Sequence, residues 1–240
     1  MAKQLANIGE YKEAEIYLKK ALKEPSSQGK VLLFIALDMA TFAQQNQQPN
    51  LRDKYTQIAR VKLAELGTPL ELAMAYYAIA VIDFNSGKYS SAEQLINLSL
   101  RTFEKESDAI GTIAALRLNA QIKLKQYREA AGLSLMEQAI SLAEDKSRYA
   151  DLKISYGILA SYFAKQRKFL IAYKYQQKQL DALEKETQFK TDIWLSQLKS
   201  GLSREQQIAA PNHSLLIAAT ADTIIPKSLL PIIFMVIGLV

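Results

Sequence analysis

The 240-residue sequence contains no cysteine and a single histidine, and both shortages limit its chemistry. Without cysteine the chain has no disulfide bonds and no thiolate metal sites. One imidazole cannot form a histidine-rich metal site, and His213 lies in the polar stretch AAPNHS, so a catalytic or ligand role is disfavoured. Glycine and proline are also few, with nine and six residues. We therefore predict an almost wholly helical chain that holds no metal and no cofactor.

Positive charge is in excess and unevenly distributed. The net charge is +6, and the segment 117–178 contains twelve Lys or Arg against five Asp or Glu. A basic surface can attract nucleic acid, anionic lipid or an acidic protein. No helix-turn-helix, zinc-finger or aromatic-basic RNA motif accompanies this charge. Solvated helix faces are therefore the favoured interpretation, and a nucleic-acid partner is disfavoured.

A short pattern recurs along the chain: a turn residue, an aromatic residue two positions later and an alanine three positions beyond that. Its copies are Gly9–Tyr11–Ala14, Gly87–Tyr89–Ala92, Lys125–Tyr127–Ala130 and Arg167–Phe169–Ala172. The interval from Gly9 to Gly87 leaves room for two units, and the polar segment QQNQQPNL (44–51) marks the missing turn. The later intervals, from Gly87 to Lys125 and from Lys125 to Arg167, are each close to half of the first. The sequence thus predicts about five repeat units.

Each unit is predicted to be an antiparallel pair of helices, an apolar leading helix followed by an amphipathic trailing helix. The expected leading helices are 30–45, 69–86, 108–125 and 147–166, after a stub at 1–8. The expected trailing helices are 11–24, 51–66, 89–106, 127–145 and 169–186. Thr68–Pro69, Asp108 and Ser147 are signals for helix starts. The turn at PNLRDKY (49–55) lacks the pattern and is expected to be extended and irregular.

These residues resemble the tetratricopeptide repeat (TPR) family, in a variant of longer period. The resemblance covers about residues 1–188, through Gly9, Tyr11, Ala14 and Ala21, and through Gly87, Tyr89 and Ala92. Lys125 and Arg167 replace the turn glycine, and Ser99 replaces the later alanine. The resemblance implies an all-α solenoid of about five hairpins wound into a right-handed superhelix. It also implies a non-enzymatic scaffold for protein interactions.

In the TPR family the leading helices line the ligand groove, and the resemblance therefore places a peptide-binding groove on them. The candidate groove residues are Met74, Tyr77, Val81, Phe84, Asn85, Asn119, Ile122, Lys123, Ile158, Ser161 and Lys165. A known TPR mode grips a terminal carboxylate with Lys, Arg and Asn, a set that only Asn119 and Lys123 resemble. The face is otherwise apolar and aromatic, which favours an amphipathic helix or apolar peptide as partner. Packing of some of these residues between units is the alternative.

No motif of an NTPase, protease, kinase or metalloenzyme occurs in the sequence. Asp38 and Asp83 lie in apolar segments, and paired carboxylates can serve as acid and base. They belong to different units, however, without a nucleophile or a glycine-rich phosphate loop nearby. A salt-bridged or helix-end role is therefore preferred, and we predict that the protein is not an enzyme.

The C-terminal part differs in character from the repeats. Residues 189–210 are expected to form an amphipathic helix that caps or connects the array, with a stripe of Phe189, Ile193, Leu198 and Leu202. Residues 211–240 form a hydrophobic tail, and Ser228–Val240 carries no charge. Thirteen helical residues span only about 20 Å of the roughly 30 Å of hydrocarbon. The start of a transmembrane helix, a short C-terminal anchor, and a segment buried in the groove or a partner all remain open.

Three functions follow, in order of preference. The first is a TPR scaffold that binds a protein or peptide and is tethered to a membrane through residues 215–240. The second is the sensor portion of a bacterial membrane signalling protein whose kinase or transcriptional output is missing. The third is a soluble regulator that binds nucleic acid through a basic face. We expect membrane association, or a cytoplasmic location if the tail is no anchor, and a chain that is a piece of a longer protein.

Overall fold

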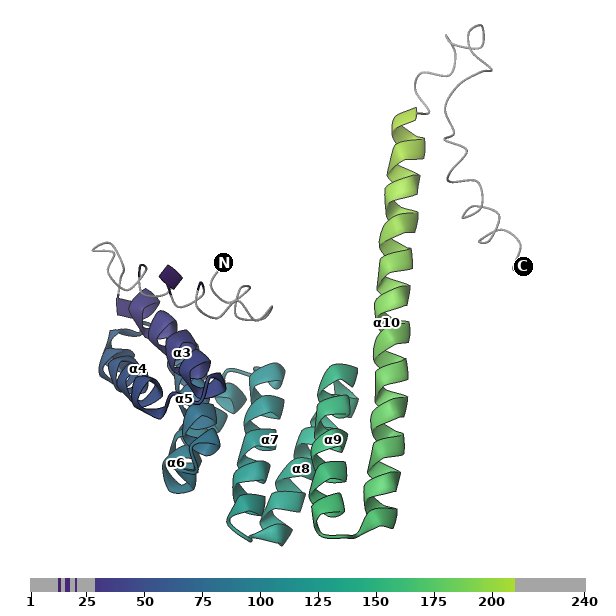
Figure 1. Ribbon diagram of the computed structural model, residues 1–240. Helices are drawn as coiled ribbons and strands as arrows, with labels where there is room; N and C mark the ends of the chain where they lie inside the picture. The colour runs from purple at the N-terminus through teal and green to yellow at the C-terminus, as the bar shows by residue number, and fades with distance from the viewer. Residues whose placement is uncertain (1–12, 14–15, 18–19, 21–28, 210–240) are drawn as a thin grey trace, which may run out of the picture. The chain divides into compact units, whose positions relative to one another are not determined.

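The computed structural model describes residues 29–209 and the isolated positions 13, 16, 17 and 20. Regular structure in this part of the chain is entirely helical, with eight α-helices and one 3₁₀ helix (Figure 1). They are α3 (Gly29–Gln45), α4 (Pro49–Lys62), η1 (Leu63–Glu65), α5 (Pro69–Asn85), α6 (Tyr89–Lys105), α7 (Ala109–Lys125), α8 (Glu129–Asp145), α9 (Tyr149–Lys165) and α10 (Phe169–Ala209). The predictions for the first hairpin, for His213 and for the tail lie outside the described residues, apart from those four positions.

The helices form successive antiparallel hairpins: α3–α4, α5–α6, α7–α8 and α9–α10. We call α3, α5, α7 and α9 the leading helices and their partners the trailing helices. Each leading helix also contacts the next leading helix, from α3 to α5, α7 and α9. This stacking confirms the predicted all-α class and solenoid architecture. The chain divides into two compact units, Met1–Glu186 and Thr187–Val240, and all the hairpin contacts discussed below lie in the first.

Six of the described turns between helices share one geometry. In each, the amide of the third turn residue donates to the carbonyl five positions earlier, as in Lys88 to Asp83 at 2.8 Å and Arg128 to Lys123 at 2.9 Å. The middle turn residue adopts a left-handed backbone, with φ between 50° and 77°; the six are Gln47, Gly87, Ser107, Tyr127, Ser147 and Arg167. Such a hydrogen bond around a left-handed residue satisfies carbonyls that the helix end leaves free.

Equal helices and equal turns give the array a constant repeat unit. The five helices from α5 to α9 each have 17 residues, and the turns that follow them each have three. The middle turn residue after each leading helix therefore recurs at one fixed interval from Gly87 to Tyr127 and Arg167, and Gln47 precedes Gly87 by the same interval. We call this interval the constant unit.

The constant unit corrects the predicted register of the fourth hairpin. The sequence pattern places Tyr127 opposite Tyr89, whereas the structure makes Tyr127 the equivalent of the turn residue Gly87, and its side chain is 97% exposed. The close approach of α8 to α7 falls at Gly132 and not at the exposed Ala130. A Cβ on Gly132 would lie 2.7 Å from Leu124 Cγ. The pattern misled because the left-handed position carries glycine in only one of the six described turns.

The turn before α4 is the second correction. Residues 46–48 form the same compact turn as the others, with the Gln48 amide 2.8 Å from the Ala43 carbonyl. Pro49 begins α4, a position where its missing N–H leaves no hydrogen bond unmade. The irregular backbone lies instead at the far end of α4, in η1. Beyond it the predicted start of α5 is confirmed, because the Thr68 hydroxyl accepts from the Glu71 amide at 3.2 Å.

Asp108 and Ser147 differ as helix starts. The Asp108 carboxylate accepts from the amides of Ile110 and Gly111, each at 3.1 Å, as predicted for an N-cap. Ser147 is a left-handed turn residue instead, and Arg148 precedes α9. The turn before α9 has three residues, like the other turns, and the helix therefore begins at Tyr149.

Many of the buried core residues are alanines. Ala36, Ala40, Ala73, Ala80 and Ala120 have no exposed surface. Small side chains at these positions let the helix backbones approach, and larger residues such as Ile79 and Ile96 fill the space between them. One buried cluster extends over α3 to α7, and two smaller ones over α7 to α10.

The last trailing helix is longer than predicted. The sequence suggests one helix ending at 186 and a second at 189–210, whereas α10 runs unbroken for 41 residues. No proline interrupts it, and Gly201 is its only glycine. The side chains from 187 to 202 are all exposed, including Phe189, Ile193, Trp194 and Leu198. Among the described residues, no helix is both apolar and long enough to span a membrane.

Candidate functional site

A groove of about 1040 Å³ lies along the leading helices of the last three described hairpins. Phe84 lines it from α5, and the first part of α10 contributes a wall through Ala172, Gln176 and Gln179. The largest share comes from the C-terminal half of α7 and from α9. Those residues are Gln121, Leu124 and Lys125 on α7, and Ile154, Gly157, Ile158, Ala160, Ser161, Tyr162, Ala164 and Lys165 on α9.

The constant unit explains why these residues share one face. The lining positions 121, 124 and 125 of α7 correspond to 161, 164 and 165 of α9 and to 81, 84 and 85 of α5. Residues spaced by three or four along a helix lie on the same side. Because neighbouring leading helices contact each other, equivalent positions form adjacent columns. We call this surface the groove face.

Four of the predicted groove residues line the groove: Phe84, Ile158, Ser161 and Lys165. Four more have the register of the groove face but do not line the hollow itself. Met74 and Asn85 are exposed, whereas Tyr77 and Val81 are half-buried. Burial raises the pKa of Tyr77, so its hydroxyl stays protonated at neutral pH.

The remaining three predicted residues lie away from the groove. Ile122 has no exposed surface, and the Asn119 amide donates to Asn97 Oδ1 at 2.9 Å. The Lys123 ammonium pairs with the Glu93 carboxylate of α6. These contacts bury the three side chains inside the array, so the prediction of a surface role for them needs correction.

The cause is the two-residue shift in the fourth hairpin. Two residues rotate a helical side chain by about 200° around the axis, from one face to the other. The predicted residues on α7 derive from the Gly87-to-Lys125 interval, while the groove positions Gln121, Leu124 and Lys125 follow from the constant unit, which places Tyr127 at the turn. A requirement that successive helices have equal length would have placed the turn at Tyr127 and so located these three groove positions from the sequence. The resemblance to a terminal-carboxylate grip through Asn119 and Lys123 therefore has no counterpart in the groove.

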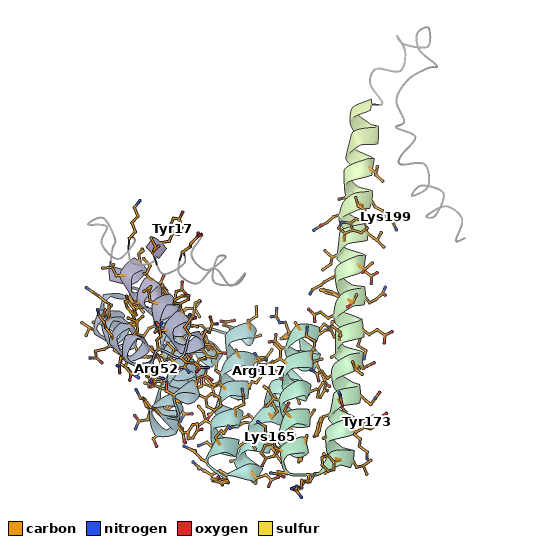
Figure 2. The ribbon with its side chains drawn as sticks, viewed as in Figure 1. Tyr17, Arg52, Arg117, Lys165, Tyr173 and Lys199 are labelled. Atoms are coloured by element: carbon orange, nitrogen blue, oxygen red, sulfur yellow. The ribbon has the colours of Figure 1, made fainter. Side chains whose placement is uncertain are left out.

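Charges on the groove face are partly neutralised within the protein. Arg117 of α7 donates to Asp151 at 3.0 Å, and Arg148 holds the other carboxylate oxygen at 2.9 Å. Figure 2 labels Arg117 on α7 and Lys165 near the end of α9. Lys125 and Lys165 are exposed, and in the part of the chain that the structure describes neither makes an ion pair. The groove therefore carries two uncompensated ammonium groups.

The rest of the lining mixes amides with apolar surface. Gln121, Gln176 and Gln179 offer donors and acceptors that suit peptide groups. Leu124 and Ile158 supply apolar contact. Burial and the nearby Glu129 carboxylate raise the pKa of Tyr162, which keeps this groove hydroxyl neutral.

Asp83 has a structural environment, in line with the preferred interpretation of the sequence. It is 2% exposed and accepts hydrogen bonds from Arg60 Nη2 at 2.5 Å and Ser91 Oγ at 2.6 Å. The carboxylate thus joins α5 to the trailing helices on both sides. Asp38 is exposed on α3, in another hairpin. Within the described residues, no three His, Cys, Asp or Glu side chains gather in a way that could hold a metal ion.

The fold is that of TPR-like repeat proteins, and solved structures share it. Aspartyl phosphate phosphatase F from Bacillus subtilis matches with a TM-score of 0.63 and 17% identity, over 82% of this chain and 52% of its own. BtubC from P. vanneervenii matches with a TM-score of 0.57 and 14% identity, over 94% and 84%. MamA matches with a TM-score of 0.50 and 16% identity, over 78% and 97%.

The chain spans about half the length of the phosphatase. No protein-family model and no curated protein matches the sequence. At these identities the likenesses establish the fold and leave the function to be argued from the site.

Proposed function

We propose that this chain is a non-enzymatic scaffold that binds a segment of a partner protein in the groove of the leading helices. The observation that carries the proposal is the groove itself, which is open along three hairpins and lined by amides, apolar side chains and lysines. A stacked array of rigid hairpins presents such a surface without rearrangement. The shared fold with TPR-like proteins supports an interaction role.

A peptide-display selection on the full chain tests the proposal. The tested variant is Ser161→Trp, because Ser161 is an exposed groove residue in α9 and an indole there would obstruct part of the hollow. Ser134→Trp is the matched control, at an exposed position of the trailing helix α8. We expect selected peptides to bind the parent and the control but to lose at least tenfold in affinity for Ser161→Trp. Selection of no peptide, or equal binding by both variants, would contradict the proposal.

Membrane tethering is a separate proposal that rests on the sequence alone. The uncharged stretch Ser228–Val240 supports it. Membrane fractionation of the chain with and without residues 212–240 tests it, and identical behaviour of the two would exclude an anchor. Kinase or DNA-binding motifs in the coding frame after Val240 would favour the sensor alternative over the plain scaffold.

A further inference from the structure

We infer that the groove selects an acidic segment of the partner, with two carboxylates that pair with Lys125 and Lys165. The inference rests on the proposed function and specifies the chemistry of its ligand. Lys125 is the last residue of α7 and Lys165 the last residue of α9. They occupy equivalent positions, one constant unit apart, and both line the same hollow.

Arg117 on the groove face already has a partner, because it is paired with Asp151. Glu129, the only acidic residue that lines the groove within the described part of the chain, lies 3.5 Å from Lys168 Nζ. Among the described residues that line the groove, Lys125 and Lys165 are the only cations. Neither is paired, within that part of the chain, with a carboxylate of the protein that would compete with an incoming anion.

The spacing of the two lysines constrains the ligand. The axes of packed helices lie about 8–10 Å apart, and α7 contacts α9 directly. An extended chain rises about 3.3 Å per residue. Acidic residues about three positions apart therefore match the two ammonium groups. An apolar residue between them can meet Leu124 and Ile158, which line the groove on the same two helices.

The amides of the lining favour a polypeptide over other anions. Gln121 on α7 and Gln176 and Gln179 on α10 can exchange hydrogen bonds with the peptide groups of an extended segment. A nucleic acid would instead need several cations along its backbone. Two lysines and three glutamines suit a short acidic peptide better than a phosphate chain.

The test uses the same display selection, now scored by composition. We expect Asp and Glu to be enriched among selected peptides, in pairs about three residues apart. The leading peptide is then labelled and titrated with the parent, with Lys125→Gln/Lys165→Gln, and with Lys105→Gln/Lys146→Gln. The last variant removes the same charge from exposed lysines at the ends of the trailing helices α6 and α8. All four lysines are exposed, and unchanged circular dichroism verifies each fold.

Loss of two partly exposed ion pairs is expected to weaken binding on the order of tenfold, while the control changes it less than twofold. Raising the salt concentration should narrow the difference between parent and groove variant. Peptides without acidic enrichment, or equal losses in the two variants, would overturn the inference and leave the proposed function standing. Tighter binding of single-stranded DNA or RNA at the same lysines would also overturn it. Failure of the Ser161→Trp test would overturn the proposed function as well.

Discussion

Substitution of Gly132 by valine tests the register set by the constant unit, on which the position of the groove depends. The added side chain would enter the contact between α7 and α8, where a Cβ already meets Leu124 Cγ at 2.7 Å and the Ala120 carbonyl at 3.0 Å. Overpacking of this kind costs about 1–3 kcal/mol. The higher helix propensity of valine over glycine returns about 0.4 kcal/mol. We expect a net loss of about 1–2 kcal/mol in the free energy of unfolding.

Ala130→Val is the matched control, because Ala130 is exposed two residues away on the same helix. Its effect should stay within about 0.5 kcal/mol. Thermal unfolding followed by circular dichroism measures both, and for a chain of this size the Gly132 variant should melt about 2–8 °C lower. Equal midpoints, or a larger loss for Ala130→Val, would show that the fourth hairpin follows the shorter Gly87-to-Lys125 interval and would refute the register.

Three further predictions concern stability. Arg60→Ala should cost about 3 kcal/mol in chemical denaturation, because it leaves the Asp83 carboxylate, 2% exposed, without its cation; Arg60→Met with Asp83→Leu should recover part of the loss. The hydrogen bond from Lys123 lowers the pKa of Glu93 below 4.5, so the stability it provides is present above that pH and is lost as the pH falls through the folded-state pKa. Between about pH 5 and pH 3, the melting temperature of Glu93→Gln should therefore fall less than the melting temperature of the parent. Gly87→Ala should cost about 1 kcal/mol, since φ is 77° there, and an equally stable variant would contradict the left-handed turn.

The sequence predicted where the helices lie along the chain better than it predicted which of their side chains face the groove. Apolar periodicity and caps such as Thr68 located the hairpins to within a few residues, because burial and capping act locally along a helix. The turns were harder, since Gln47, Tyr127 and Arg167 occupy the left-handed position as Gly87 does. Hydrogen bonds of the turn stabilise this backbone for any side chain, so composition does not identify it.

The candidate groove shows the consequence of that ambiguity. On α5 and α9 the predicted register holds, and Phe84, Ser161 and Lys165 line the hollow. On α7 the prediction was shifted by two residues, so it named the buried Ile122 and Lys123 in place of Leu124 and Lys125, which line the groove. The pairing of Asp151 with Arg117, which lies 34 residues earlier, is a long-range contact that no local pattern predicts. The extension of α10 past Glu186 likewise depends on the absence of a break and not on a positive signal.

Site-specific photocrosslinking tests the central claim most directly. A benzophenone amino acid replaces Tyr127, an exposed aromatic residue that also lines the groove, or, as control, Ser141 on the exposed side of α8. Each variant is illuminated with the leading selected peptide. We expect a covalent adduct at position 127, suppressed by excess unlabelled peptide, and none at position 141. Adducts at 141 but not at 127 would show that the partner binds the trailing helices and would contradict the assignment of the groove.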